Sequence, residues 1–158
     1  MLARQGQLAD ALEAYRAGLA IRERLARADP GDAQAQRDLS VSHNNIGDML
    51  ARQGQLGDAL DAYRAGLAIA ERLARADPGD AQAQRDLFVS CVRIASVAPE
   101  QADAALTRAR DIVAQMQVEG RLDPADAWMP AEIERRLAEA RGGGLESGQV
   151  PSPLAGEG

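Results

Sequence analysis

The stretch that decides the fold is residues 49–78, MLARQGQLGDALDAYRAGLAIAERLARADP. Within it, small or apolar residues recur at steps of three and four: Leu56, Ala59, Leu60, Tyr63, Gly66, Leu67, Ala70, Leu73 and Ala74. Such steps place side chains on one face of an α-helix. Pro78 marks the end, because the residue before a proline is pushed out of the helical region. The stretch therefore predicts an amphipathic helix over 56–76.

A second helix is predicted just upstream, over residues 33–52. Its stripe consists of Leu39, Val41, His43, Ile46, Met49 and Leu50. Asp32 is suited to cap its N-terminus, and Gly54 can take the left-handed conformation that ends many helices. No segment alternates in the manner of a β-strand, so the predicted building block is a pair of helices.

This block is repeated with a period of 48 residues. Residues 1–39 and 49–87 differ at three of 39 positions, namely Ala9/Gly57, Glu13/Asp61 and Arg22/Ala70. A fixed period of this size is typical of solenoids. By the same pattern, Asp80 is predicted to cap the next helix, and Gly6 to adopt the left-handed conformation of Gly54.

The third unit departs from the pattern. Its first helix is predicted over 81–97, where Pro99 stops it early. A second helix over 100–119 has two competing registers, and the residues do not choose between them. One register buries Ala102, Leu106, Ala109, Val113 and Met116; the other uses Ala105 and Ile112.

A capping helix is predicted over 124–140. Asp123-Pro124 supplies an N-cap followed by proline at the first helical position, and Pro130 is expected to kink or restart the helix. It carries Trp128, Ile133 and Leu137. Residues 1–141 thus form the predicted repeat domain. Residues 142–158 are rich in Gly, Ser and Pro and predict a disordered tail.

At Ile46-Gly47-Asp48-Met49-Leu50, Gly54, Ala59-Leu60, Tyr63, Gly66-Leu67 and Asp77-Pro78 the chain resembles a tetratricopeptide repeat. The resemblance implies an all-α fold, an α-solenoid of antiparallel helix hairpins wound into a superhelix, with units at about 1–30, 31–78 and 79–119. A standard unit has about 34 residues. The 14 extra residues here indicate a long-unit variant, with seven added to each helix, and so helices of roughly 20 residues and about 30 Å.

The resemblance also implies that the first helix of each hairpin lines a concave groove for a protein or peptide partner. The candidate groove residues are Val41, Asn44, Asn45, Asp48, Ala51, Arg52, Val89, Val92, Arg93 and Ser96. Much of the divergence between the copies falls there, which indicates either recognition or decay of the third unit toward a cap. Arg93 has no acid three or four residues away, so it can pair with a ligand carboxylate or with Asp48. Asn45 and Arg93 match two positions of the clamp that grips chaperone tails, but the clamp's lysines are absent.

Composition argues against catalysis. The chain has one cysteine, one histidine and no lysine, which excludes multi-cysteine zinc sites, histidine clusters and Schiff-base chemistry. His43 and Cys91 occupy the same place in successive units, and we expect both in the core. Several acids have an arginine four residues on, typical of solvated helix faces: Glu23–Arg27, Asp48–Arg52, Glu71–Arg75 and Glu132–Arg136. We predict no catalytic residue, metal or cofactor.

Charge and hydropathy exclude two further classes of partner. A net charge of −6 with a pI near 4.8 argues against nucleic acid, which requires a basic surface. No apolar run approaches the roughly 20 residues of a membrane span. The N-terminal segment recurs inside the chain, so we interpret it as a structural unit and not as a targeting signal. With a single unpaired cysteine, the predicted compartment is the cytoplasm.

The first helix, predicted over 7–28, lacks most of its partner, because residues 1–5 match only the last turn of the helix that should precede it. Its stripe of Leu8, Leu12, Tyr15 and Leu19 should be partly exposed, and such patches mark association surfaces. The alternatives to a groove-binding scaffold are therefore a self-association element acting through 7–28, or a regulatory arm of a larger multidomain signalling protein. In the second case the chain would be a fragment of a longer array.

Overall fold

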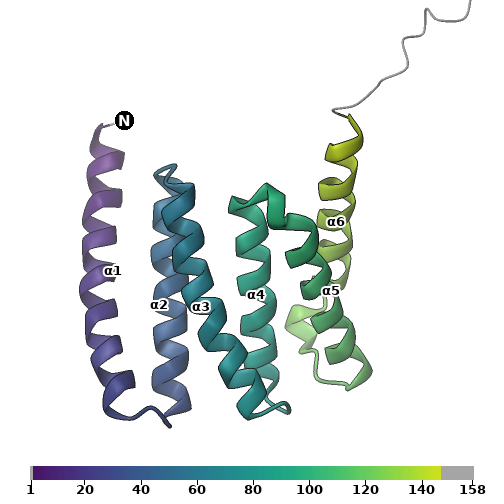
Figure 1. Cartoon of the computed structure of the whole chain (residues 1–158), viewed down its shortest axis with the longest axis horizontal. Coiled ribbons are helices and arrows are strands. Elements are labelled where there is room, and N and C mark those ends of the chain that lie inside the picture. Colours follow the sequence, from purple (N-terminus) through teal and green to yellow (C-terminus); the bar gives the residue numbers. More distant parts are fainter. Residues whose placement is uncertain (1, 147–158) are drawn as a thin grey trace, which may run out of the picture.

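The computed structural model describes residues 2–146, which form a row of α-helices (Figure 1). The α-helices are α1 (Leu2–Ala28), α2 (Ala33–Arg52), α3 (Leu56–Ala76), α4 (Ala81–Val97), α5 (Ala102–Val118) and α6 (Met129–Glu146). Two short 3-10 helices join the later ones, η1 (Pro99–Gln101) and η2 (Pro124–Asp126). Successive helices pack side by side as antiparallel pairs. The predicted all-α array of helix hairpins is confirmed.

The predicted aspartate caps open α2 and α4. Asp32 Oδ1 accepts hydrogen bonds from the backbone N–H groups of Gln34, at 2.9 Å, and Ala35, at 3.1 Å. Asp80 Oδ1 does the same for Gln82 at 2.9 Å and Ala83 at 3.2 Å. Each cap satisfies N–H groups that the helix itself leaves unpaired, so the 48-residue repeat in sequence becomes a repeat in helix starts.

Small residues let α2 and α3 approach closely. A Cβ atom added at Gly47 would lie 2.4 Å from Tyr63 Cε1, and one added at Gly66 would lie 2.7 Å from Asn44 Oδ1. Ser40 Oγ also donates to the Gly66 carbonyl at 2.9 Å. Since protein interiors are close-packed, these two glycines set the distance between the helices of the hairpin.

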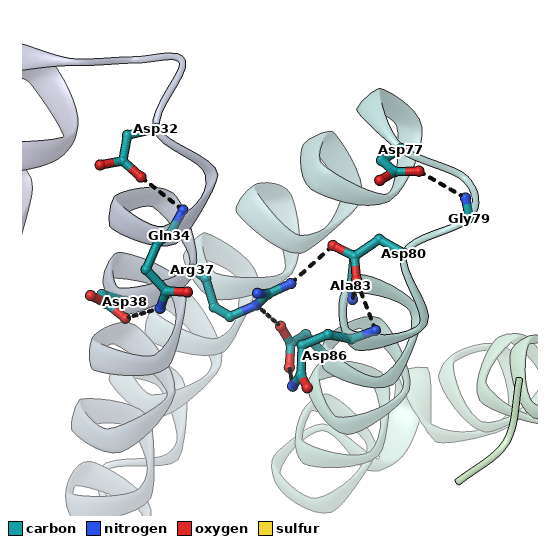
Figure 2. Close-up of polar contacts among 10 residues, drawn as sticks. Asp32, Gln34, Arg37, Asp38, Asp77, Gly79, Asp80, Ala83 and Asp86 are labelled. Atoms are coloured by element: carbon teal, nitrogen blue, oxygen red, sulfur yellow. Dashed lines mark hydrogen bonds and ion pairs between the residues drawn. The ribbon is translucent and has the colours of Figure 1, made fainter.

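An arginine near the start of α2, and its counterpart near the start of α4, each pair with an aspartate further along the array. Figure 2 shows Arg37 of α2 between two aspartates of the following unit, with Nη2 3.1 Å from Asp80 and Nε 3.1 Å from Asp86. Forty-eight residues later, Arg85 Nε donates to the buried Asp126 of η2 at 2.8 Å. The same residue of the repeat therefore makes the same kind of contact twice.

The prediction for Gly6 is wrong. Residues 1–8 and 49–56 are both MLARQGQL, yet α1 runs through Gly6, whereas Gly54 has φ +78° and separates α2 from α3. The Gly54 turn is closed by hydrogen bonds from Gly54 N to Ala51 O at 3.0 Å and from Gln55 N to Leu50 O at 2.9 Å. Packing of α3 on α2 favours this turn. Residues 3–7, by contrast, are exposed in the structure, so the helix propensity of Ala, Arg and Gln decides.

Two predictions near the C-terminus are corrected. Asp123 caps η2, not α6; α6 begins at Met129, so Pro130 restarts the helix, and it ends at Glu146 instead of 140. Residues 142–146, predicted as tail, are therefore helical. The remainder of the predicted tail, 147–158, lies outside the described residues.

The structure also selects one register for α5. The buried residues are Ala102, Leu106, Ala109, Val113 and Met116, so the register built on Ala105 and Ile112 is wrong. The chosen face meets α4 on one side and α6 on the other. Among the described helices, none is long and apolar enough to cross a membrane.

Replacing each glycine of the repeated octapeptide by alanine should change stability in opposite directions. An added Cβ meets no atom within 4 Å at either position, so backbone conformation alone decides. Gly54→Ala should destabilise by about 1–2 kcal/mol, because a side chain disfavours positive φ. Gly6→Ala should stabilise by up to about 1 kcal/mol, because glycine is a poor helix former. Urea unfolding followed by circular dichroism measures both; a loss of stability for Gly6→Ala would contradict the helical conformation at Gly6.

Candidate functional site

A cleft opens between α4 and α6. α6 packs mainly against α5. A gap therefore remains between α4 and α6, and buried core residues form its floor. A pocket of about 240 Å³ lies there, lined by Phe88, Val89, Val92, Arg93, Trp128, Glu132, Ile133 and Arg136. A second pocket of about 520 Å³ shares Arg136 and adds Ala95, Ser96, Pro99, Ala102, Leu106, Glu139 and Ala140. We call these two pockets together the α4–α6 cleft.

Trp128 is the prominent side chain of this cleft. Its ring meets that of the buried Phe88 edge to face, with centroids 6.4 Å apart and an interplanar angle of 76°. Trp128 nevertheless remains 52% exposed. An aromatic ring that packs against the core and still exposes half of its surface is well suited to anchor a partner, since tryptophan is enriched among the residues that dominate binding energy.

Charged side chains on the rim are paired with one another. Glu132 accepts from Arg135 Nη2 at 2.6 Å and from Arg136 Nε at 2.8 Å. The hydrogen bond from Arg135, followed by that from Arg136, lowers the pKa of Glu132 to about 2. The cleft therefore has an apolar floor and a rim on which charged side chains are paired with one another.

The predicted groove residues separate into two groups. Val89, Val92 and Arg93 line the smaller pocket, and Ser96 lines the larger one. The remaining candidates belong to α2, beyond the cleft: Val41 and Arg52 are exposed, while Asn45, Asp48 and Ala51 are half-buried. Asn44 is buried, with its side chain against Gly66 of α3. It faces the partner helix of its own hairpin, so we leave it out of the binding surface.

Arg93 is engaged by Asp48. Arg93 Nε donates to Asp48 Oδ1 at 3.0 Å, and Nη2 donates to Oδ2 at 3.2 Å. Tyr63 donates its hydroxyl to the same Oδ1 at 2.6 Å. Of the two partners predicted for Arg93, the structure contains Asp48, and this fork joins α4 to α2 and, through Tyr63, to α3.

One predicted pair along a helix is replaced by this contact. Asp48 was predicted to pair with Arg52. It pairs instead with Arg93, which donates hydrogen bonds to both carboxylate oxygens of Asp48. The pairs Glu23–Arg27 and Glu71–Arg75 form at 3.9 Å, and Glu132–Arg136 forms at 2.8 Å.

Cys91 and His43 are placed for packing. Cys91 is 2% exposed, and burial raises the pKa of its thiol to about 11. His43 is half-buried, and burial lowers its pKa from 6.5. Residues 2–146 contain no group of three or more His, Cys, Asp or Glu side chains arranged to hold a metal ion.

The sequence did not single out Trp128 as a residue of an open cleft. It assigned the residue to the interior of a capping helix, whereas Trp128 lies in the turn before α6. A signal was present, because Trp128 is the single tryptophan of a chain with 3% aromatic residues.

Comparison with known families identifies the class of the central hairpin. Residues 42–77, covering the second half of α2 and all of α3, match the tetratricopeptide repeat family. Repeats of this class commonly mediate protein binding, and no enzyme family is indicated. Searches of curated proteins and of solved structures found no match to the chain. The row of helices is consistent with a tetratricopeptide-repeat-like array.

Cys91 should be unreactive in the folded chain. Since the thiolate is the reacting form, a thiol pKa near 11 instead of 9.0 leaves about 100-fold less thiolate at pH 8. Ellman's reagent should therefore react at least about 100-fold more slowly with the native chain than with the chain unfolded in guanidinium. Fast native reaction would contradict the buried position.

Above pH 9 the unfolded thiol ionises first, so this thiol's contribution to stability should fall between pH 9 and 11.

Proposed function

We propose that this chain is a non-catalytic helical repeat scaffold that binds a protein or peptide through the α4–α6 cleft. The observation that carries the proposal is Trp128, half exposed beside an apolar pocket and held by the buried ring of Phe88. The partner would insert an apolar side chain beside Trp128, with the rest of its chain running along α4.

The pocket beside Trp128 is small and has a rigid floor. It measures about 240 Å³, below the roughly 300–1,000 Å³ of most small-molecule sites, while the second pocket of the cleft measures about 520 Å³. The floor of the smaller pocket is core: Phe88 and Ile133 are 2% and 1% exposed. A rigid floor keeps the pocket preformed, which reduces the ordering cost of binding.

The binding surface extends from α4 toward α2. Val89, Val92, Arg93 and Ser96 supply the α4 side. The Asp48–Arg93 fork bridges to α2, where the exposed Val41, together with Asn45 and Arg52, continues the proposed surface. A partner several residues long would thus contact two units that the fork holds together.

We propose further that the array is a long-unit variant of the tetratricopeptide repeat. The 48-residue period in sequence supports this proposal, as do the lengths of α2 and α3, which have 20 and 21 residues. The arginine–aspartate pair also recurs at this period, at Arg37 and at Arg85. The single unpaired cysteine supports a cytoplasmic location.

Peptide selection on the full chain tests the cleft directly. Twelve-residue peptides would be selected by phage display, labelled with fluorescein and titrated by anisotropy against wild type, Trp128→Ala and Val92→Glu. We expect both variants to bind at least about 10-fold more weakly, equal to about 1.4 kcal/mol. Trp128 fluorescence should also shift on binding to wild type, because this tryptophan lies at the contact.

The matched control is Val118→Glu. Val118 is 83% exposed on α5 and lines neither pocket of the cleft, so the affinity of this variant should stay within about twofold of wild type. Circular dichroism checks that each variant folds. Equal binding by wild type, Trp128→Ala and Val92→Glu would reject the cleft as the binding site.

A further inference from the structure

One face of α1 is open where the same face of α3 is covered. The two helices are near-copies, offset by 48 residues. Tyr63 is 2% exposed, but its counterpart Tyr15 is 40% exposed; Ile69 is 5% exposed, but Ile21 is 50% exposed. We call the surface formed by Tyr15, Gly18, Ile21 and Arg22 the α1 outer face.

The chain itself shows what fits this face, because α2 covers it in α3. The backbone of Gly47 lies against the Tyr63 ring, and Asn44 and Ser40 lie over Gly66. Asp48 accepts the Tyr63 hydroxyl hydrogen bond at 2.6 Å. A helix on the α1 outer face would meet an identical tyrosine and glycine, in the same spacing.

One substitution changes the chemistry of the face. Arg22 stands where α3 has Ala70, and Arg22 Nη1 lies 3.1 Å from the position of a Cβ atom on Gly18. In α3 the equivalent place over Gly66 holds Asn44 Oδ1, at 2.7 Å. A covering helix would therefore meet a guanidinium over Gly18, and a carboxylate at the place of Asn44 would pair with it.

We propose that the α1 outer face is a second binding surface, which takes an amphipathic helix of the α2 pattern from another protein. That helix has glycine opposite Tyr15, a carboxylate that accepts the Tyr15 hydroxyl, and a second carboxylate for Arg22. The surface lies at the opposite end of the row from the α4–α6 cleft (Figure 1), so it is independent of the function proposed above.

A second copy of this chain fits the pattern poorly. Its α2 is already packed between α1 and α3. Its end helix α6 has no glycine from Met129 to Arg141, so this part of α6 cannot approach Tyr15 as closely as Gly47 approaches Tyr63.

A labelled peptide of residues 33–52 is the probe for this surface. We expect the Asn44→Asp form of the peptide to bind the full chain at least about fivefold more tightly than the unmodified peptide by anisotropy, and this preference to vanish in an Arg22→Ala chain. A peptide carrying Gly47→Leu should bind at least about 10-fold more weakly, because its side chain would collide with Tyr15. The control chain Val118→Glu, altered at an exposed residue of α5, should bind like wild type.

A second measurement avoids the cost of folding a free peptide. In a chain with residues 33–48 added directly before Met1, the joint recreates the sequence 33–56, since residues 1–8 equal 49–56. If the added helix covers the α1 outer face, Gly6 must turn as Gly54 does, and Gly6→Ala should then lower the melting temperature. In the original chain the same substitution should raise it. An unchanged sign would overturn the proposal, whatever the peptide does.

Sedimentation supplies the remaining test. We expect the original chain to be monomeric at the concentrations of the titrations. A dimer that Tyr15→Glu converts to monomer would show that a second copy covers the face, and it would also overturn the proposal. Neither result bears on Trp128 or Val92, so failure here is distinguishable from failure of the cleft.

Discussion

The structure depends on the close approach of α2 and α3, which is possible because a glycine stands opposite each bulky group. Gly47 faces the Tyr63 ring, and Gly66 faces Asn44. The enclosed Tyr63 ring donates its hydroxyl hydrogen bond to Asp48. Asp48 also accepts a hydrogen bond from Arg93 of α4. One packing contact thus determines the hairpin and also prepares the contact between neighbouring hairpins.

Stacking of the units follows from a small number of charged side chains at the seams. Arg37 reaches Asp80 and Asp86, Arg85 reaches Asp126, and Arg93 reaches Asp48. Apart from the buried Asp126, these groups are partly exposed, so the pairs among them contribute modestly to stability. These pairs act mainly on geometry, because a planar guanidinium donates hydrogen bonds to a carboxylate only in certain relative positions. The apolar seams supply the driving force, and the arginines define which helix lies next to which.

Both proposed binding surfaces lie where helices of residues 2–146 are left partly uncovered by their neighbours. In the third unit, Pro99 shortens the link to α5, and the turn at 119–128 carries Trp128 to the edge of α4. In the regular part of the array, between α2 and α4, the Asp48–Arg93 fork bridges the two helices. At the other end, α1 retains the sequence of a covered helix while one of its faces is open. Regular stacking hides apolar surface from water, so its irregularities are where surface remains for partners.

Local chemistry in the sequence was sufficient for the three central helices α2, α3 and α4. The aspartate caps at 32 and 80, the prolines after each hairpin and the three- and four-residue periodicity predicted α2, α3 and α4 with their observed bounds. The orientation of Asn44, the register of α5 and the exposure of Trp128 could not be predicted in this way, because each depends on which neighbour lies across from it. The octapeptide MLARQGQL shows the reason most directly. The copy at 49–56 contains a turn at Gly54, because α2 packs on α3 there. In the first copy, residues 2–8 are continuous helix, so the same residues adopt the conformation that their tertiary contacts favour.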